Sequence, residues 1–235
     1  MRLVALSDCR SPSPFSLTPS SYRILLVEIE IALWLSLFLF GASAPYKYLS
    51  VVIPFFLALP ALFPPRLPHV LLPVALAFTL VADFFFVLLS PPHPIVAISL
   101  FLFVQTVYFL FLRSRDSRAR TARALIVRLL ICLSAIPPIL LFFGADPVPL
   151  LGAAYGVFLV ANLKDALCSP YRSFAVGMLL FFLCDLSLGV SFLLARRALS
   201  ASAAFSGYAA WAFYPPSQTL IALSVGADRY HLARV

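Results

Sequence analysis

Apolar residues in this chain occur in long, nearly uncharged runs, which are typical of membrane-spanning helices. Apolar residues make up 63% of the 235 residues and charged residues 11%, whereas a soluble domain averages about 45–50% apolar and about 25% charged. A water-soluble fold cannot bury that much apolar surface. The sequence also lacks the alternating ten-residue segments of a membrane barrel. It therefore predicts an all-α, polytopic membrane protein.

Charged residues and Pro/Gly clusters divide the apolar sequence into eight predicted transmembrane helices. Each is close to the ~20 residues that cross about 30 Å of hydrocarbon. The predicted helices cover residues 23–41, 47–63, 68–89, 94–112, 124–143, 148–165, 171–194 and 206–225. This gives a disordered Ser/Pro-rich tail at residues 1–22, a transmembrane domain at 23–225 and a short tail at 226–235.

Basic residues predict how these helices are oriented. Five arginines lie in the segment 113–123, between the fourth and fifth predicted helices, and such a segment is expected on the cytoplasmic side. With eight helices, both termini are then cytoplasmic too. The excess of basic residues on the cytoplasmic side of membrane proteins, together with their attraction to anionic membrane lipids, explains the net charge of +8. No nucleic-acid partner is expected, because the arginine run contains no aromatic residues.

Two aspartates interrupt the apolar runs, Asp83 in the third predicted helix and Asp185 in the seventh. A charged carboxylate at the centre of a bilayer costs about 2.5–3.5 kcal/mol on insertion scales, and such residues usually have a function. Counted at 1.5 Å per residue, both lie roughly 21–23 Å from the cytoplasmic edge. We therefore predict a pair that faces one chamber. The alternative is structural pairing with Lys47 or with tyrosines.

Further polar residues within the apolar runs are candidates for the same site. Gln105 and Tyr108 are three residues apart in the fourth predicted helix, and Tyr214 and Gln218 are four residues apart in the eighth, so each pair shares one helix face. The recurrence of such a pair four helices later indicates a weak parallel repeat of four helices. The alternative is that these residues have structural roles. The tyrosines would then pack between helices, the glutamines would form hydrogen bonds between helices, and the lysine would reach the membrane surface. The candidates are Lys47, Gln105, Tyr108, Tyr155, Tyr214 and Gln218.

Other kinds of catalytic site find little support in the sequence. The three histidines lie in predicted loops or at helix ends, and the four cysteines show no CxxC spacing, so no metal or other cofactor is expected. The chain contains no GxSxG, P-loop or GxGxxG motif. An enzyme with this sequence would have to rely on its carboxylate pair.

Short motifs occur in order on six of the predicted helices. They are Tyr46-Lys47-Tyr48; Ala82-Asp83; Phe103, Gln105 and Tyr108; Tyr155; Gly177, Phe181, Cys184 and Asp185; and Tyr214, Gln218, Leu220 and Ile221. Together they resemble the YhhN/TMEM86 family of eight-helix membrane proteins, which includes lysoplasmalogenases. The chain departs from the family pattern at Ala82, where members have Gly, at Cys184 in place of Ser, and at Gln105, where many have His.

The resemblance implies a hydrolase that cleaves the vinyl ether of a lysoplasmalogen, with Asp83 and Asp185 as catalytic residues. One carboxylic acid would protonate the β-carbon, and the other carboxylate would stabilise the cation or activate water, as in glycoside hydrolysis. The resemblance further implies a lysophospholipid as partner and, in a eukaryote, the endoplasmic reticulum. The oligomeric state stays open.

Two other functions fit the same residues. A proton-coupled transporter of small solutes would use both aspartates as a proton relay, with the repeat as its moving halves. A non-catalytic lipid-binding protein of the same fold would be consistent with the changed neighbours Ala82 and Cys184.

Overall fold

Eight α-helices make up almost all of the part of the chain that the structure describes. The computed structural model describes residues 19–39, 43–62, 67–114, 116–196 and 200–232, and every regular element in them is helical. A 3₁₀ turn, η1, extends α2, and a π-helix, η2, extends α3. The elements are α1 (Pro19–Leu39), α2 (Ala44–Ala58), η1 (Leu59–Leu62), α3 (Leu67–Asp83), η2 (Phe84–Leu88), α4 (Pro94–Leu112), α5 (Arg118–Phe143), α6 (Pro147–Leu167), α7 (Arg172–Arg196) and α8 (Ser200–Leu232).

The eight predicted helices all occur, in the predicted order. When η1 and η2 are counted with α2 and α3, most bounds lie within four residues of the prediction, but α5 begins six residues earlier and α8 extends six residues before and seven residues after its predicted range. Six of them, from α2 to α7, are long and apolar enough to cross a membrane. Within the described residues α1 and α8 do not meet that requirement, so eight spans are not confirmed. In α1 the reason is charge, because Arg23, Glu28 and Glu30 all lie in its 21 residues.

The two predicted tails differ from what the structure describes. Of the tail predicted at 1–22, residues 1–18 lie outside the described residues, and α1 already begins at Pro19. The tail predicted at 226–235 is mostly helical, because α8 continues to Leu232. The cytoplasmic placement of both termini requires α1 and α8 to span the membrane, and it stays a prediction.

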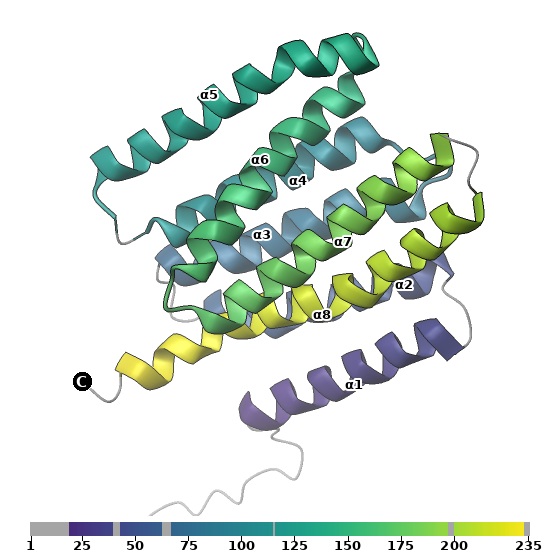
Figure 1. Ribbon diagram of the computed structural model, residues 1–235. Helices are drawn as coiled ribbons and strands as arrows, with labels where there is room; N and C mark the ends of the chain where they lie inside the picture. Colours follow the sequence, from purple (N-terminus) through teal and green to yellow (C-terminus); the bar gives the residue numbers. More distant parts are fainter. Residues whose placement is uncertain (1–18, 40–42, 63–66, 115, 197–199, 233–235) are drawn as a thin grey trace, which may run out of the picture.

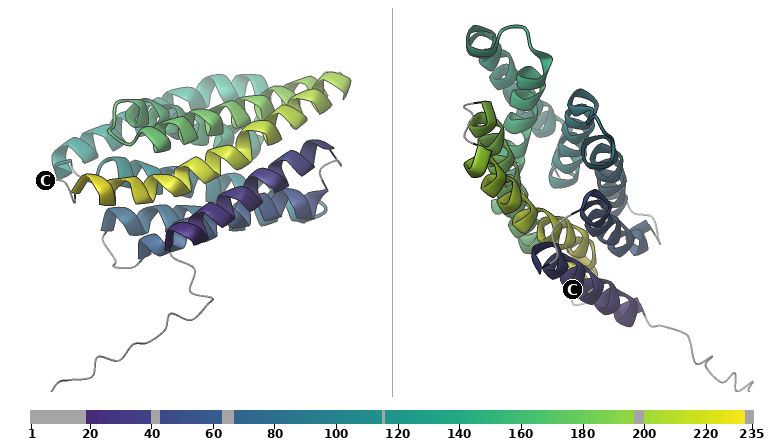
Figure 2. Two further views of the ribbon diagram at one scale, coloured as in Figure 1. Left: turned by 90° about the horizontal axis from the view of Figure 1, so that it is seen from below. Right: turned by 90° about the vertical axis from the view of Figure 1, so that its right-hand side faces the viewer.

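The helices form an elongated bundle in which consecutive helices run in opposite directions (Figure 1). At one end of the bundle α2, α4, α6 and α8 begin, and at the other end α3, α5 and α7 begin. The helices α1 and α5 lie at opposite edges (Figures 1 and 2). Most of the contacts of α5 are with α6, whereas α2 packs against α1, α3 and α8.

Polar and apolar side chains are distributed as expected for a protein that lipid surrounds. Large apolar side chains are exposed along the outside, for example Leu141 (81% exposed) and Phe142 (78%) on α5. Several polar side chains are instead buried inside the bundle, among them Thr79, Asn162 and Thr219. This arrangement suits hydrocarbon, where each buried polar group needs a partner within the protein.

The tightest packing joins α7 to α8 at Gly177. A Cβ atom built on Gly177 would lie 2.8 Å from Cγ1 of Ile221 and 2.9 Å from the carbonyl oxygen of Ser217. The second contact is with backbone, which cannot turn aside as a side chain can. Small residues that let helix backbones approach closely are typical of membrane bundles. Gly177 therefore sets the distance between the two helices.

We expect Gly177→Ala to lower the free energy of unfolding by about 1–3 kcal/mol, because the added methyl group forces α7 away from α8. The matched control is Gly189→Ala on the same helix, where a Cβ atom would meet nothing within 4 Å. Thermal unfolding of the purified protein in detergent measures both. Equal midpoints for the two variants would contradict the close approach at Gly177.

Candidate functional site

A cavity of about 930 Å³ lies between the helices and is lined by residues from all of α2 to α8 and from η2. Its lining includes the first residues of α2 and α4, Ala44 and Pro94, and Leu193 near the end of α7. The cavity therefore lies toward the end of the bundle at which α2, α4 and α6 begin. Under the predicted orientation, this is the end away from the cytoplasm.

Asp83 lies at the point where α3 changes from an α-helix to a π-helix. A π-helical turn changes the direction in which successive side chains point, and such turns are frequent at functional sites. Its side chain lines the cavity and is only 2% exposed. The hydroxyl group of Tyr214 on α8 donates a hydrogen bond of 2.6 Å to Oδ2 of Asp83. This bond connects two helices that are 131 residues apart in sequence.

Asp185 lies near the middle of α7 and lines the same cavity, where its side chain is half-buried. The hydroxyl group of Tyr155 on α6 donates a hydrogen bond to Oδ2 of Asp185. The preceding Cys184 is buried and also lines the cavity. Each aspartate thus receives a phenolic hydroxyl group from a neighbouring helix. The two carboxylates share one chamber, which is the geometry that the sequence led us to expect.

Lys47, in the first turn of α2, is the cationic side chain of the cavity lining. Its Nζ atom lies 5.0 Å from the centre of the Trp211 ring, a cation–π distance. The side chain is half-buried at the end of the cavity, as predicted from its place before the second apolar run. Trp211 also lines the cavity, and sequence reasoning missed it. The available signal was its spacing of three residues from Tyr214, which places both on one face of α8.

Three of the predicted site residues lie outside the cavity lining, namely Gln105, Tyr108 and Gln218. All three are fully buried. Oε1 of Gln105 accepts a hydrogen bond of 2.8 Å from Nδ2 of Asn162, and Nε2 of Gln218 donates one of 3.3 Å to the hydroxyl group of Ser217. None of the three lines the cavity in this structure, and their assignment to the substrate site stays a prediction.

A second set of buried polar side chains is centred on Arg128 of α5, which is only 3% exposed. Its guanidinium donates hydrogen bonds of 2.7 Å to Asn162 and 2.7 Å to Asp165 on α6, and it lies 4.2 Å from the centre of the Phe109 ring. Through Asn162 this group reaches Gln105. The sequence placed Arg128 within an apolar run but gave it no partner. The available signal was Asp165, an acidic residue at the end of the next predicted helix.

Most of the cavity lining is apolar. Phenylalanines from four different helices, Phe86, Phe101, Phe143 and Phe182, lie beside aliphatic residues. Some apolar lining residues are largely exposed, including Leu186 (52%), Leu193 (50%) and Phe192 (44%). The cavity is not fully enclosed by protein. Its shape and lining suit a molecule with a long apolar part.

The described residues contain no group of three or more His, Cys, Asp or Glu side chains placed to hold a metal ion. The ionisable side chains of the cavity lining are Lys47, the three aspartates Asp83, Asp146 and Asp185, the tyrosines Tyr155 and Tyr214, and Cys184. A carboxyl group can transfer a proton, and a second carboxylate can stabilise a cation close to it. A cation at the end of the cavity can bind an anionic group of a ligand.

Comparison of the chain with known proteins gave no match. No family model matches it, and it has no significant similarity to a curated protein or to a solved structure. Its function therefore has to be inferred from the residues of the site and their chemistry.

We expect Tyr214→Phe to lower the free energy of unfolding by about 1–3 kcal/mol, because it removes the only hydroxyl group that this structure shows bonded to the buried Asp83. Tyr208→Phe is the control, since Tyr208 lies on the same helix and is 59% exposed. Thermal unfolding in detergent provides the measurement. If Tyr214→Phe were as stable as the wild type and Tyr208→Phe, the hydrogen bond would have no structural role.

Proposed function

We propose that this protein is a membrane-embedded hydrolase that cleaves the vinyl ether bond of a lysoplasmalogen. The observation that carries the proposal is the cavity in which Asp83 and Asp185 lie with Lys47 at one end. Further support comes from the resemblance to the YhhN/TMEM86 family. Of the eight residues that this resemblance assigns to the site, five line the cavity: Lys47, Asp83, Tyr155, Asp185 and Tyr214.

The two carboxyl groups match the needs of the reaction. A vinyl ether is cleaved when an acid protonates its β-carbon, which leaves an oxocarbenium ion. In the proposed reaction one aspartic acid supplies this proton, and the other, ionised aspartate stabilises the cation and takes a proton from the attacking water. The hemiacetal then breaks down into a fatty aldehyde and the free hydroxyl group of the glycerol. The net reaction consumes one water molecule.

The tyrosines serve this chemistry by fixing the carboxyl groups. Tyr214 holds Asp83, and Tyr155 holds Asp185. Each hydrogen bond limits the rotation of its carboxyl group, so that the other oxygen atom is directed consistently toward a substrate. Reacting groups that are held in place before the reaction lower its entropic barrier. In this proposal both tyrosines are positioning residues.

The remainder of the cavity fits the two ends of a lysophospholipid. Lys47 provides a positive charge for the phosphate group, and Trp211 beside it provides an aromatic face. The apolar lining accommodates the long alkenyl chain, and the exposed apolar residues at the margin allow entry from the bilayer. A substrate that already resides in the membrane can then reach the carboxyl groups without passing through water.

We expect Asp83→Asn and Asp185→Asn each to reduce the rate of aldehyde release from lysoplasmalogen by at least about 100-fold, since an amide can neither donate the required proton nor stabilise a cation. The control is Glu28→Gln, which makes the same chemical change at an exposed position of α1 outside the cavity. The assay measures fatty aldehyde released by purified protein in lipid nanodiscs.

Two outcomes would contradict the hydrolase. The wild-type protein could release no aldehyde from any lysoplasmalogen, or either Asn variant could keep the wild-type rate. In the first case, proton-coupled uptake of solutes into vesicles should be measured next, since a transporter would use the same two aspartates.

We expect Lys47→Gln to raise KM about tenfold while kcat changes little, because the lysine binds the phosphate group in the ground state and the transition state alike. Titration of the activity with lysoplasmalogen measures both constants. Arg118→Gln is the control, as Arg118 is exposed and lies outside this cavity. A fall in kcat without a change in KM would show that Lys47 acts in the chemical step instead.

A further inference from the structure

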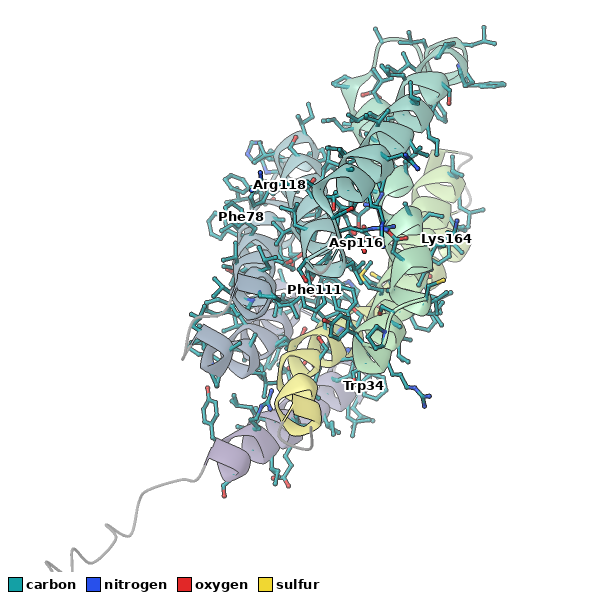
Figure 3. The ribbon with its side chains drawn as sticks, turned by 90° about the vertical axis from the view of Figure 1, so that its left-hand side faces the viewer. Trp34, Phe78, Phe111, Asp116, Arg118 and Lys164 are labelled. Atoms are coloured by element: carbon teal, nitrogen blue, oxygen red, sulfur yellow. The ribbon has the colours of Figure 1, made fainter. Side chains whose placement is uncertain are left out.

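A second cavity of about 750 Å³ lies between α5 and α6, toward the end of the bundle at which α5 begins and α6 ends. We call it the α5–α6 groove. Its lining contains five cationic side chains, namely Arg113, Arg120, Arg123, Arg128 and Lys164. Gly156 and Val160 of α6 line both this groove and the cavity that holds the aspartates, so α6 separates the two. Figure 3 views the molecule from this end and labels Asp116, Arg118 and Lys164.

Two of the five cations are neutralised within the protein. Arg113 forms ion pairs with Asp116 at 2.9 Å and Asp165 at 2.6 Å, and Arg128 forms one with Asp165 at 2.7 Å. Of the remaining cations, Arg120 reaches Asp116 only at 3.9 Å. Because Asp116 and Asp165 are already used, the groove carries excess positive charge.

Arg123 and Lys164 supply most of this excess. Both are exposed, and neither forms an ion pair in the part of the chain that the structure describes. They come from different helices, Arg123 from the second turn of α5 and Lys164 from the last turn of α6. An anionic group between them would be bound from both sides. Basic pockets between transmembrane helices are typical binding sites for anionic lipid head groups.

The other half of the groove is apolar. Val127 and Ile131 of α5 and Val160 of α6 line it, and each is about half exposed. From Arg120 to Ile131 the groove follows α5 for roughly 16 Å, at 1.5 Å per residue. A free phosphate ion would contact only the basic half. A phospholipid matches both halves, with its phosphate among the cations and a fatty acyl chain along the apolar residues.

We propose that the α5–α6 groove binds an anionic phospholipid, with its phosphate group between Arg123 and Lys164 and one acyl chain along Val127, Ile131 and Val160. The site is separate from the aspartate cavity and does not depend on the proposed hydrolase. The lipid is recognised by negative charge and by its chain, and it is not chemically changed.

Native mass spectrometry of the full-length protein tests the proposal, with phosphatidylglycerol and phosphatidylcholine of identical acyl chains as probes. The wild-type protein should retain phosphatidylglycerol in preference. The double variant Arg123→Gln/Lys164→Gln should weaken this binding by at least about tenfold, because it removes both unpaired cations. The control Arg118→Gln/Arg172→Gln removes the same charge from exposed residues outside the groove, and it should change binding less than about twofold.

A third variant, Ile131→Trp, tests the apolar half without a change in charge. The larger side chain fills the groove where the acyl chain would lie, so phosphatidylglycerol binding should fall while the melting temperature stays unchanged. Equal loss of binding in both double variants would overturn the proposal, since it would indicate non-specific attraction to surface charge. Complete displacement of the lipid by millimolar inorganic phosphate would overturn it as well, because the groove would then bind phosphate alone.

Discussion

The hydrogen bonds between tyrosine hydroxyl groups and buried carboxylates determine how this bundle is arranged. A polar group within an apolar environment costs several kcal/mol unless a partner satisfies it. Asp83 on α3 is therefore compatible with the fold only where α8 brings Tyr214 to it, and Asp185 on α7 only where α6 brings Tyr155. These two bonds relate four helices to one another. The cavity lies among those helices, so the groups that fix the fold also line the site.

The same physical rule applies at the other end of the bundle. Arg128 is buried in an apolar helix, and its guanidinium is satisfied by Asn162 and Asp165 of α6. Asp165 is shared with Arg113, the residue that follows α4, and this ion pair holds the end of α4 near the end of α6. The helix α5 has an otherwise exposed apolar surface and packs mainly against α6. Its position therefore depends on this charged cluster more than on apolar burial.

Much of the helical architecture could be predicted from the sequence, because apolar runs and their boundaries directly report helices of membrane length. The expectation that Asp83 and Asp185 share one cavity rested on a similar argument, as each residue adds a fixed rise along a helix. Rotation about the helix axis was harder. The helices α4 and α7 are apolar on almost every face, so no amphipathic pattern shows which side turns inward. Gln105 and Tyr108 of α4 were therefore assigned to the site although they do not line the cavity. The predicted count of eight spans is not confirmed, since three charges of α1 interrupt an otherwise apolar run and six helices of the described part of the chain meet the requirements of a span.

The helix α6 lies between the cavity that holds the aspartates and the α5–α6 groove. Gly156 and Val160 are accessible from both, and the same helix carries Tyr155 toward one and Lys164 toward the other. At Gly156 and Val160, α6 alone separates the two cavities. A displacement of α6 that widened the groove would narrow the cavity on its other side, in front of Asp185. Lipid in the groove would thereby affect the geometry of the cavity that holds the aspartates. The composition of the surrounding bilayer could then change this cavity directly, without a diffusing ligand.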